Sequence, residues 1–279
     1  MIKTYYKLIK PGIIFGNLVT CIGGFILASK GEINALLLLA AAGGLSLIIA
    51  SGCVFNNYID RDADAKMERT RERALVKQTI SAPHALIFAL ILGCAGAAIL
   101  ALFTNLLTLL IALIGFVIYV TAYSLLKYHS THATLVGAVA GATPPVVGYC
   151  AVTGRLDAAA LILFAILFLW QMPHFYAIAI YRFQDYAAAS IPVLPIRKGV
   201  PATRAQIVIY ATIFALTTPL LTLFGYTGYL YLAVTSLAAL IWLVLCLRKQ
   251  ADEKLWARRV FLFSLPVVTL FSLMISLNV

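Results

Sequence analysis

Charged side chains are scarce in this sequence. Only 11% of its 279 residues are Asp, Glu, Lys or Arg, whereas a soluble globular domain carries about 25%. Hydrophobic residues make up 63% of the chain and the mean hydropathy is +0.99. So few charges cannot cover the surface of a water-soluble protein of this length. The composition therefore predicts a chain that lives in a lipid bilayer.

Common catalytic signatures are absent as well. The five cysteines form no C-x-x-C pair and four of them lie inside apolar runs. They indicate small packing residues, and neither a disulfide framework nor a zinc site. The sequence contains no G-x-S-x-G, H-E-x-x-H, P-loop or G-x-G-x-x-G pattern.

The charges are mostly positive, with 21 Lys and Arg against 10 Asp and Glu and a net charge of +11. They sit in short gaps between apolar runs. Because no basic domain exists that could carry a nucleic-acid footprint, we expect no nucleic-acid partner. Positive gaps of this kind set the orientation of a membrane protein and attract anionic lipids or an anionic substrate.

Nine continuous apolar runs are long enough to cross a bilayer as helices, which takes about 20 residues each. Because these runs do not alternate, they exclude a strand barrel. The basic stretch before the first run also fits a signal peptide, but the many later runs favour a first spanning helix. We expect an all-α polytopic membrane protein with spans at about 11–29, 35–57, 83–103, 106–126, 134–153, 158–181, 205–224, 228–247 and 258–277.

The distribution of positive charges predicts the orientation. If the N-terminus is cytoplasmic and nine spans alternate, only Lys30 and Arg155 of the 21 Lys and Arg residues fall on the outer side. One span wrongly added or dropped in the middle would destroy this asymmetry. We therefore expect a cytoplasmic N-terminus and a C-terminus on the outer side.

Two polar cytoplasmic segments are long, at about 58–82 and 182–204, and they lie four spans apart. This spacing predicts one intramembrane domain over residues 1–279. The domain would consist of two four-helix halves, about 1–127 and 128–247, and a ninth helix at about 258–277. We expect both segments to meet above one central cavity.

The first polar segment holds a stripe of oxygen ligands. Asn56, Asp60 and Asp64 are spaced i, i+4, i+8, so on a helix they share one face, whereas Asp62 points elsewhere. Two carboxylates and an amide oxygen suit Mg²⁺, which also takes ligand phosphates and waters. The alternative is a solvated loop, but charged residues at membrane depth are costly and typical of function.

Basic residues follow this stripe at once and can hold an anion such as a diphosphate. They are Lys66, Arg69, Arg71, Arg73 and Lys77. Near the end of the fourth span, Tyr123 and Lys127 lie one helical turn apart. Lys127 is a further candidate phosphate ligand, or else a charge that only sets topology.

The second polar segment contributes one carboxylate, Asp185, with Arg182, Arg197 and Lys198 nearby. Asp185 is a candidate catalytic residue with Asp60 and Asp64, and it could complete the metal shell from the other half of the molecule. Alternatively, it pairs with Arg182.

His174 follows a proline inside the sixth span. A buried imidazole there could contact an iron porphyrin or another substrate. The alternative is a core histidine with satisfied hydrogen bonds.

These motifs resemble those of a known protein family. Asn56-x3-Asp60-x3-Asp64 and Tyr123-x3-Lys127 resemble motifs of the UbiA-like intramembrane prenyltransferase superfamily. Nearly the whole chain is similar to one branch, the bacterial protoheme IX farnesyltransferases or heme O synthases. The blocks that carry this likeness are NNYIDRDADAKMERTRER, GATPPVVGYCAV, WQMPHFYAIAIYRFQDY and IPVLP. Where the wider superfamily commonly has two aspartates four residues apart, this sequence has Asp185 with Tyr181 and Ala189 at the flanking positions.

The resemblance implies a function. It implies a nine-helix fold in the bacterial inner membrane that transfers farnesyl from farnesyl diphosphate to a vinyl group of heme b, giving heme O. It implies Mg²⁺ as cofactor, and product handover to a heme A synthase or a terminal oxidase assembly. Prenyl transfer to a quinone or chlorophyll precursor and transport of heme are the alternatives. The family's metal and diphosphate roles fall on Asn56, Asp60, Asp64, Asp185, Arg69, Arg73 and Lys127.

Overall fold

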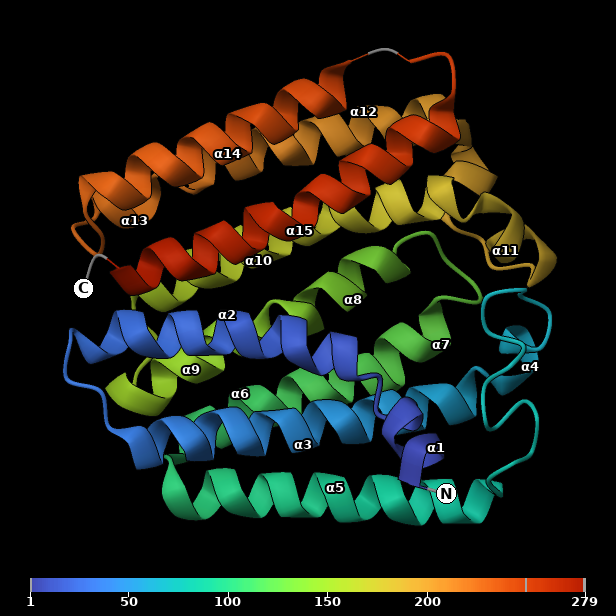
Figure 1. The fold of residues 1–279 in the computed structure, drawn as a ribbon, viewed down its shortest axis with the longest axis horizontal. Helices are drawn as coiled ribbons and strands as arrows, with labels where there is room; N and C mark the ends of the chain where they lie inside the picture. Colours follow the sequence, from blue (N-terminus) through green and yellow to red (C-terminus); the bar gives the residue numbers. More distant parts are fainter. Residues whose placement is uncertain (1, 249, 278–279) are drawn as a thin grey trace.

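The protein is an all-helical bundle in the computed structural model, which describes residues 2–248 and 250–277 (Figure 1). Nine helical segments of this part are long and apolar enough to cross a membrane, as the sequence predicts. They are α2 (Pro11–Ser29), α3 (Ala35–Ile59), α5 (Ala82–Phe103), α6 (Leu106–Val117) continued by η1 (Ile118–Tyr123) and α7 (Ser124–Leu126), α8 (Ala133–Gly141) with α9 (Thr143–Thr153), α10 (Ala158–Tyr181), α12 (Leu194–Thr217) with α13 (Leu220–Leu223), α14 (Tyr229–Leu247) and α15 (Glu253–Leu277).

The orientation of these helices across a membrane and the division into two halves remain predictions. Lys249, one of the cations assigned to the cytoplasmic side, lies outside the described residues.

Short polar side chains begin three of the spanning helices. Asn34 accepts a hydrogen bond from the Leu37 N–H (3.1 Å) at the start of α3. Asn105 and Asp157 cap α6 and α10 in the same way. Such caps satisfy backbone donors that have no partner within the helix, so the sequence locates these helix starts well.

The second polar segment is more helical than expected. Residues 182–204 contain α11 (Phe183–Ala188) and the first part of α12, which begins at Leu194 rather than near 205. Gly199 bends α12 with a left-handed backbone (φ 80°), a conformation open to glycine. Hydropathy predicted only the apolar part of this helix, because residues 194–204 contain three cations, two prolines and a glycine, a composition that looks like a loop.

Glycines bring α2 and α9 into backbone contact. A Cβ atom at Gly24 would lie 2.0 Å from the Pro145 carbonyl oxygen, and one at Gly148 would lie 1.9 Å from the Cys21 carbonyl oxygen. Close approach through small residues is the usual way to pack helices where lipid removes the hydrophobic driving force.

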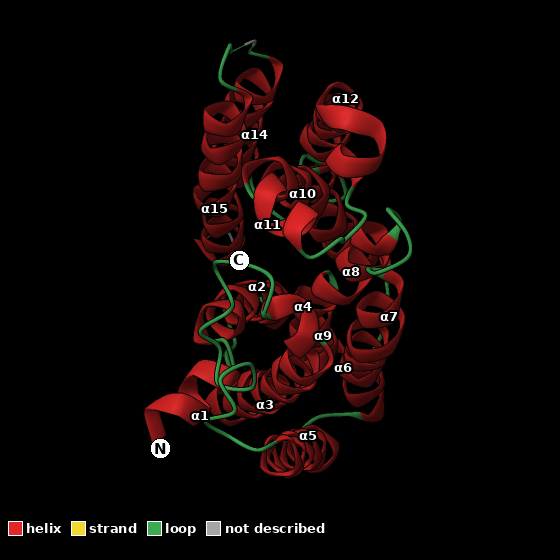
Figure 2. Cartoon of the chain, turned by 90° about the vertical axis from the view of Figure 1, so that its right-hand side faces the viewer, coloured by secondary structure: helices red, strands yellow, loops and turns green. Residues whose placement is uncertain are grey.

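The last helix closes the bundle onto the first spanning helix. A Cβ atom at Gly23 of α2 would lie 3.3 Å from the Ser272 carbonyl oxygen of α15. On its other side α15 accepts indole hydrogen bonds from Trp170 of α10 (2.8 Å) and Trp242 of α14 (3.0 Å). Figure 2 shows α12 and α14 at one side of the bundle and α3 and α5 at the other, with α2, α9 and α10 between them.

A cavity of about 510 Å³ lies at the end of the bundle where α2 finishes, lined by Lys30, Tyr149 and Arg155 among others. This is the end that carries the two cations assigned to the outer side. The central cavity expected under the two polar segments remains a prediction.

The glycine contact between α2 and α9 can be tested. Gly24→Ala should lower the free energy of unfolding by about 1–3 kcal/mol, because the methyl group would overlap a backbone carbonyl. Thermal unfolding of the protein in detergent measures the loss. Gly16→Ala is the matched control on the same helix, since nothing lies within 4 Å of its Cβ position. Equal melting temperatures for the two variants would contradict the close packing.

Candidate active site

Asn56, Asp60 and Asp64 lie along one continuous helical path. α3 ends at Ile59 and the short helix α4 (Arg61–Asp64) follows, but the backbone pattern continues across the join. The Asp60 N–H donates to the Asn56 carbonyl oxygen (2.9 Å) and the Asp64 N–H donates to the Asp60 carbonyl oxygen (2.7 Å). The Asp62 side chain is 87% exposed. The structure therefore arranges this stripe as the spacing predicts.

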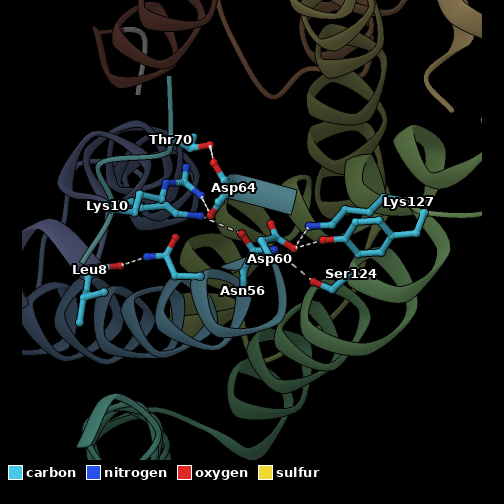
Figure 3. A network of polar contacts seen from close by, with 11 residues as sticks. Leu8, Lys10, Asn56, Asp60, Asp64, Thr70, Ser124 and Lys127 are labelled. Carbon is cyan, nitrogen blue, oxygen red and sulfur yellow. Dashed lines mark hydrogen bonds and ion pairs between the residues drawn. The ribbon is translucent and has the colours of Figure 1, made fainter. Parts of the chain in front are cut away.

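One side-chain oxygen of each residue in this stripe meets a different cation (Figure 3). Lys127 forms an ion pair with Asp60 Oδ1. Arg73 Nη1 lies 2.5 Å from Asp64 Oδ2. Lys10 Nζ, from the turn between α1 (Ile2–Leu8) and α2, donates to Asn56 Oδ1 over 2.7 Å.

These oxygens are shielded from water. The Asp64 side chain is 2% exposed and the Asp60 side chain 13%. A buried carboxylate is stable only with a cation or several donors beside it, so the three cations stabilise charges that the fold removes from solvent.

Neutral donors complete the network. The Tyr128 hydroxyl donates to Asp60 Oδ1 (2.8 Å), and Asn56 Nδ2 donates to the Ser124 hydroxyl (3.2 Å). Ser124 follows the π-helical turn η1 and donates to the Tyr119 carbonyl oxygen (3.0 Å). Such a turn adds one residue to the helix and occurs often at functional sites. Here it precedes the residues that face α3.

Burial perturbs the titration of the groups outside the spans. It lowers the pKa of Lys10 to about 8, so the ammonium form still predominates at neutral pH. Burial also lowers the pKa of Lys127, while the neighbouring Asp60 carboxylate opposes this shift. Burial raises the pKa of Tyr128, and the charge of Asp60 raises it further. Tyr128 is therefore a neutral hydrogen-bond donor.

The two polar segments meet, as expected. Ala63 and Met67 of the first segment pack in one cluster with Ala189 and Ile191 of the second. Tyr186 of α11 packs against this cluster. Burial raises the pKa of Tyr186, and both the Asp185 and Asp60 charges raise it further. Tyr186 thus lies within electrostatic reach of carboxylates from both segments.

The structure does not bring Asp185 into one group with Asp60 and Asp64. Among residues 2–248 and 250–277, no three His, Cys, Asp or Glu side chains are placed to hold a metal ion together. Mg²⁺ usually takes one or two protein carboxylates and completes its octahedron with phosphate oxygens and waters. Asp60, Asp64 and the Asn56 amide oxygen are a donor set of that kind, so these residues fit Mg²⁺.

The other predicted diphosphate residues lie around this network in less direct positions. Arg69 is exposed, and its charge opposes the rise that burial causes in the pKa of the neighbouring Tyr186. Arg182 lies over the Tyr181 ring (4.5 Å) and forms no ion pair with Asp185 within the described chain. Three more are exposed cations: Lys66, Arg197 and Lys198. Of the predicted cations, Arg73 and Lys127 alone pair with Asp60 or Asp64 in the part of the chain described, whereas Arg71 and Lys77 pair with Glu72.

His174 belongs to the interface between α10 and α15. Its ring stacks on Trp170 (4.7 Å between centroids) and contacts Phe261. Its Nδ1 lies 2.6 Å from the Ser264 hydroxyl, and that hydroxyl donates to the Phe261 carbonyl oxygen (2.6 Å). The Ser264 hydroxyl thus links the His174 ring to the backbone of α15 and holds the ring through Nδ1.

Sequence reasoning missed Lys10 and Tyr128 as members of the network. Tyr128 adjoins Lys127, and that position could have drawn attention to it. Lys10 precedes Pro11 at the start of the first span and is 46 positions from Asn56, so no spacing rule relates the two.

Comparison with known proteins now decides the family. The sequence profile of the UbiA prenyltransferase family matches residues 17–265. The chain belongs to the UbiA prenyltransferase family. The protoheme IX farnesyltransferases of Serratia proteamaculans and Cronobacter sakazakii are each 53% identical to this UbiA-family chain over 281 aligned residues, covering 100% of this chain and 95% of theirs.

Solved structures of UbiA homologues share the fold. A digeranylgeranylglyceryl phosphate synthase has a TM-score of 0.81 at 20% identity, covering 99% of this chain and 98% of that one. A UbiA homologue from Archaeoglobus fulgidus bound to DMAPP and Mg²⁺ has a TM-score of 0.78 at 15% identity, covering 99% and 100%. At these identities the likeness to solved structures shows the fold alone. The family match and the nine apolar helices of the described residues show that the chain is a multi-pass membrane prenyltransferase of this family.

The pair between Lys127 and Asp60 should stabilise the fold. Lys127→Met should lower the free energy of unfolding by about 1–3 kcal/mol, because it leaves Asp60 with fewer partners in a shielded site. Denaturant unfolding in detergent measures this loss. In a double-mutant cycle, adding Asp60→Asn to Lys127→Met should cost less than it does in the wild type. Additive effects would argue against a direct pair.

Proposed function

We propose that this chain is a protoheme IX farnesyltransferase. The allylic C–O bond of farnesyl diphosphate breaks and a new C–C bond forms at a vinyl group of heme b. Water then adds its hydroxyl to the other vinyl carbon and releases a proton, so the products are heme O and diphosphate. The full-length similarity to named protoheme IX farnesyltransferases supports this substrate pair. The observation that carries the reaction type is the shielded stripe of Asn56, Asp60 and Asp64, with a cation beside each of the three residues.

The stripe would hold Mg²⁺, the predicted cofactor. Asn56, Asp60 and Asp64 offer the hard oxygen ligands that this ion prefers. The solved UbiA homologue with DMAPP and Mg²⁺ supports such a site. When bound, Mg²⁺ neutralises charge on the departing diphosphate.

The basic side chains would hold the diphosphate. Arg73 and Lys127 already lie at the carboxylates, so each needs only a small movement to reach a phosphate oxygen beside them. Preorganised cations at a leaving group stabilise the negative charge that develops as the C–O bond breaks. Tyr128 can donate a further hydrogen bond there. Asp185 and the outer cations would close the site from above: Lys66, Arg69, Arg182, Arg197 and Lys198.

His174 is proposed to bind the heme. Its Ser264 partner holds the ring through Nδ1, so Nε2 is the nitrogen that would ligate iron, as neutral imidazole does. The aromatic side chains around it are suitable neighbours for a porphyrin.

The positive-inside charge distribution supports a bacterial inner-membrane protein whose N-terminus and two polar segments face the cytoplasm. Heme O released there would pass to a heme A synthase or a terminal oxidase assembly.

Substitution of the acidic stripe tests the proposed function. Asp60→Asn and Asp64→Asn should each lower farnesyl transfer by at least about 10²-fold, because each removes a charged ligand for the cation that stabilises the leaving group. Mass spectrometry of the product from heme b, farnesyl diphosphate and Mg²⁺ measures the effect, and chelation should abolish product formation. Asp62→Asn is the matched control, since that carboxylate is exposed. Wild-type turnover in both stripe variants would refute the metal assignment, and transfer to 4-hydroxybenzoate in place of heme would refute the acceptor.

Replacing His174 tests the heme contact. His174→Ala should weaken heme b binding by about tenfold or more and shift the Soret band, because the iron would lose a ligand. Absorbance titration of the detergent-purified protein measures both. His84→Ala is the control, because His84 is exposed at the start of α5. If affinity and spectrum match the wild type, His174 is not part of the heme site.

A further inference from the structure

Lys10 differs from the other cations of the N-terminal stretch. Lys3 and Lys7 are exposed on α1, as expected for charges that only set membrane orientation. Lys10 is half-buried, and its ammonium reaches the innermost oxygen of the proposed metal stripe, Asn56 Oδ1 at 2.7 Å. Positive-inside topology requires no such contact.

The backbone at Lys10 is held in a costly conformation that aims this side chain. Lys10 has a left-handed backbone (φ 52°, ψ 68°) directly before Pro11. A non-glycine residue rarely adopts this region, and a following proline favours an extended backbone instead. The turn is fixed by Asn57, whose Nδ2 donates to the Leu8 carbonyl oxygen over 2.9 Å. Neighbouring side chains of α3, Asn56 and Asn57, thus hold the two sides of one turn.

Asn56 Oδ1 cannot serve the Lys10 ammonium and a divalent cation in the same way at the same time, because the two positive charges would repel each other at contact distance. When Mg²⁺ takes that oxygen, the ammonium must turn to another acceptor. Lys127 and Arg73 stand in the same relation to Asp60 and Asp64. A diphosphate, with several anionic oxygens, is an acceptor that could satisfy all three cations beside the metal.

We propose that Lys10 is a diphosphate-binding residue that exchanges Asn56 for the diphosphate when Mg²⁺ binds, and that this exchange makes the metal and the diphosphate bind cooperatively. This inference rests on the proposed function, because it assumes that the stripe holds Mg²⁺. When Mg²⁺ binds alone, it must displace Lys10, Arg73 and Lys127 from the stripe, and these cations then have no new partner. When diphosphate binds alone, it is repelled by the carboxylates of Asp60 and Asp64. Each ligand therefore raises the affinity for the other by the same factor.

Binding measurements on the full-length protein in detergent test this exchange. Calorimetric titrations with Mg²⁺ are made with and without saturating inorganic diphosphate, on the wild type, Lys10→Gln and Lys10→Met. In the wild type, diphosphate should raise Mg²⁺ affinity by at least about tenfold. In both variants Mg²⁺ alone should bind more tightly, diphosphate should bind about tenfold more weakly, and the coupling factor should shrink. Lys7→Gln is the matched control and should behave as the wild type.

The two variants separate charge from structure. Lys10→Gln removes the positive charge but keeps a hydrogen-bond donor for Asn56, so it preserves the turn. Lys10→Met removes the charge and the donor. If one variant fails to fold, the other decides. Coupling of wild-type strength in a folded Lys10 variant would overturn the inference.

The outcome is distinct from failure of the proposed function. If Mg²⁺ and diphosphate couple through Lys10 but the wild type does not farnesylate heme b, the role of Lys10 stands and heme b is not the acceptor. If the wild type makes heme O but Lys10→Gln retains full coupling, the acceptor stands and the role of Lys10 is refuted.

Discussion

Removal of charge from water at the end of α3 is the constraint on which the rest of this structure depends. Asp60 and Asp64 are shielded, and each is stable because a cation lies against it. Lys127 comes from the end of the fourth span and Arg73 from the first polar segment, while Lys10 binds the neighbouring Asn56 from the turn before α2. One electrostatic requirement thus ties together segments that hydrophobic packing alone would not place in register.

The helices supply the rigidity that this arrangement needs. Gly24 and Gly148 let α2 and α9 touch backbone to backbone, and this contact fixes α2, whose first turn follows Lys10. The π-helical turn η1 precedes Ser124 and Lys127 on the segment that faces α3. A site for a highly charged ligand needs such preorganisation, because mobile cations would lose affinity to the entropy of ordering them.

Different comparisons support different levels of the functional argument. Likeness to solved UbiA homologues at 15–20% identity describes the fold and says nothing of the prenyl acceptor. Similarity of 53% over the whole chain to protoheme IX farnesyltransferases supports heme as the acceptor. The chain's own residues carry the proposed chemistry: a stripe of oxygen ligands that fits Mg²⁺, with cations beside it, and a histidine held by Ser264 between α10 and α15.

The sequence by itself determined the membrane class, the nine spans and the shared face of Asn56, Asp60 and Asp64. These features depend on local hydrophobicity and on the fixed helical repeat, both of which are readable along the chain. It did not determine the helical extent of residues 182–204, because the cations, prolines and glycine of that segment have the composition of a loop. Only the tertiary structure decided that Lys10 and Tyr128 join the network, that Asp185 forms no three-carboxylate group with Asp60 and Asp64 among the described residues, and that His174 faces Ser264. Those contacts join residues far apart in the chain, and their geometry depends on how whole helices pack, which no local spacing encodes.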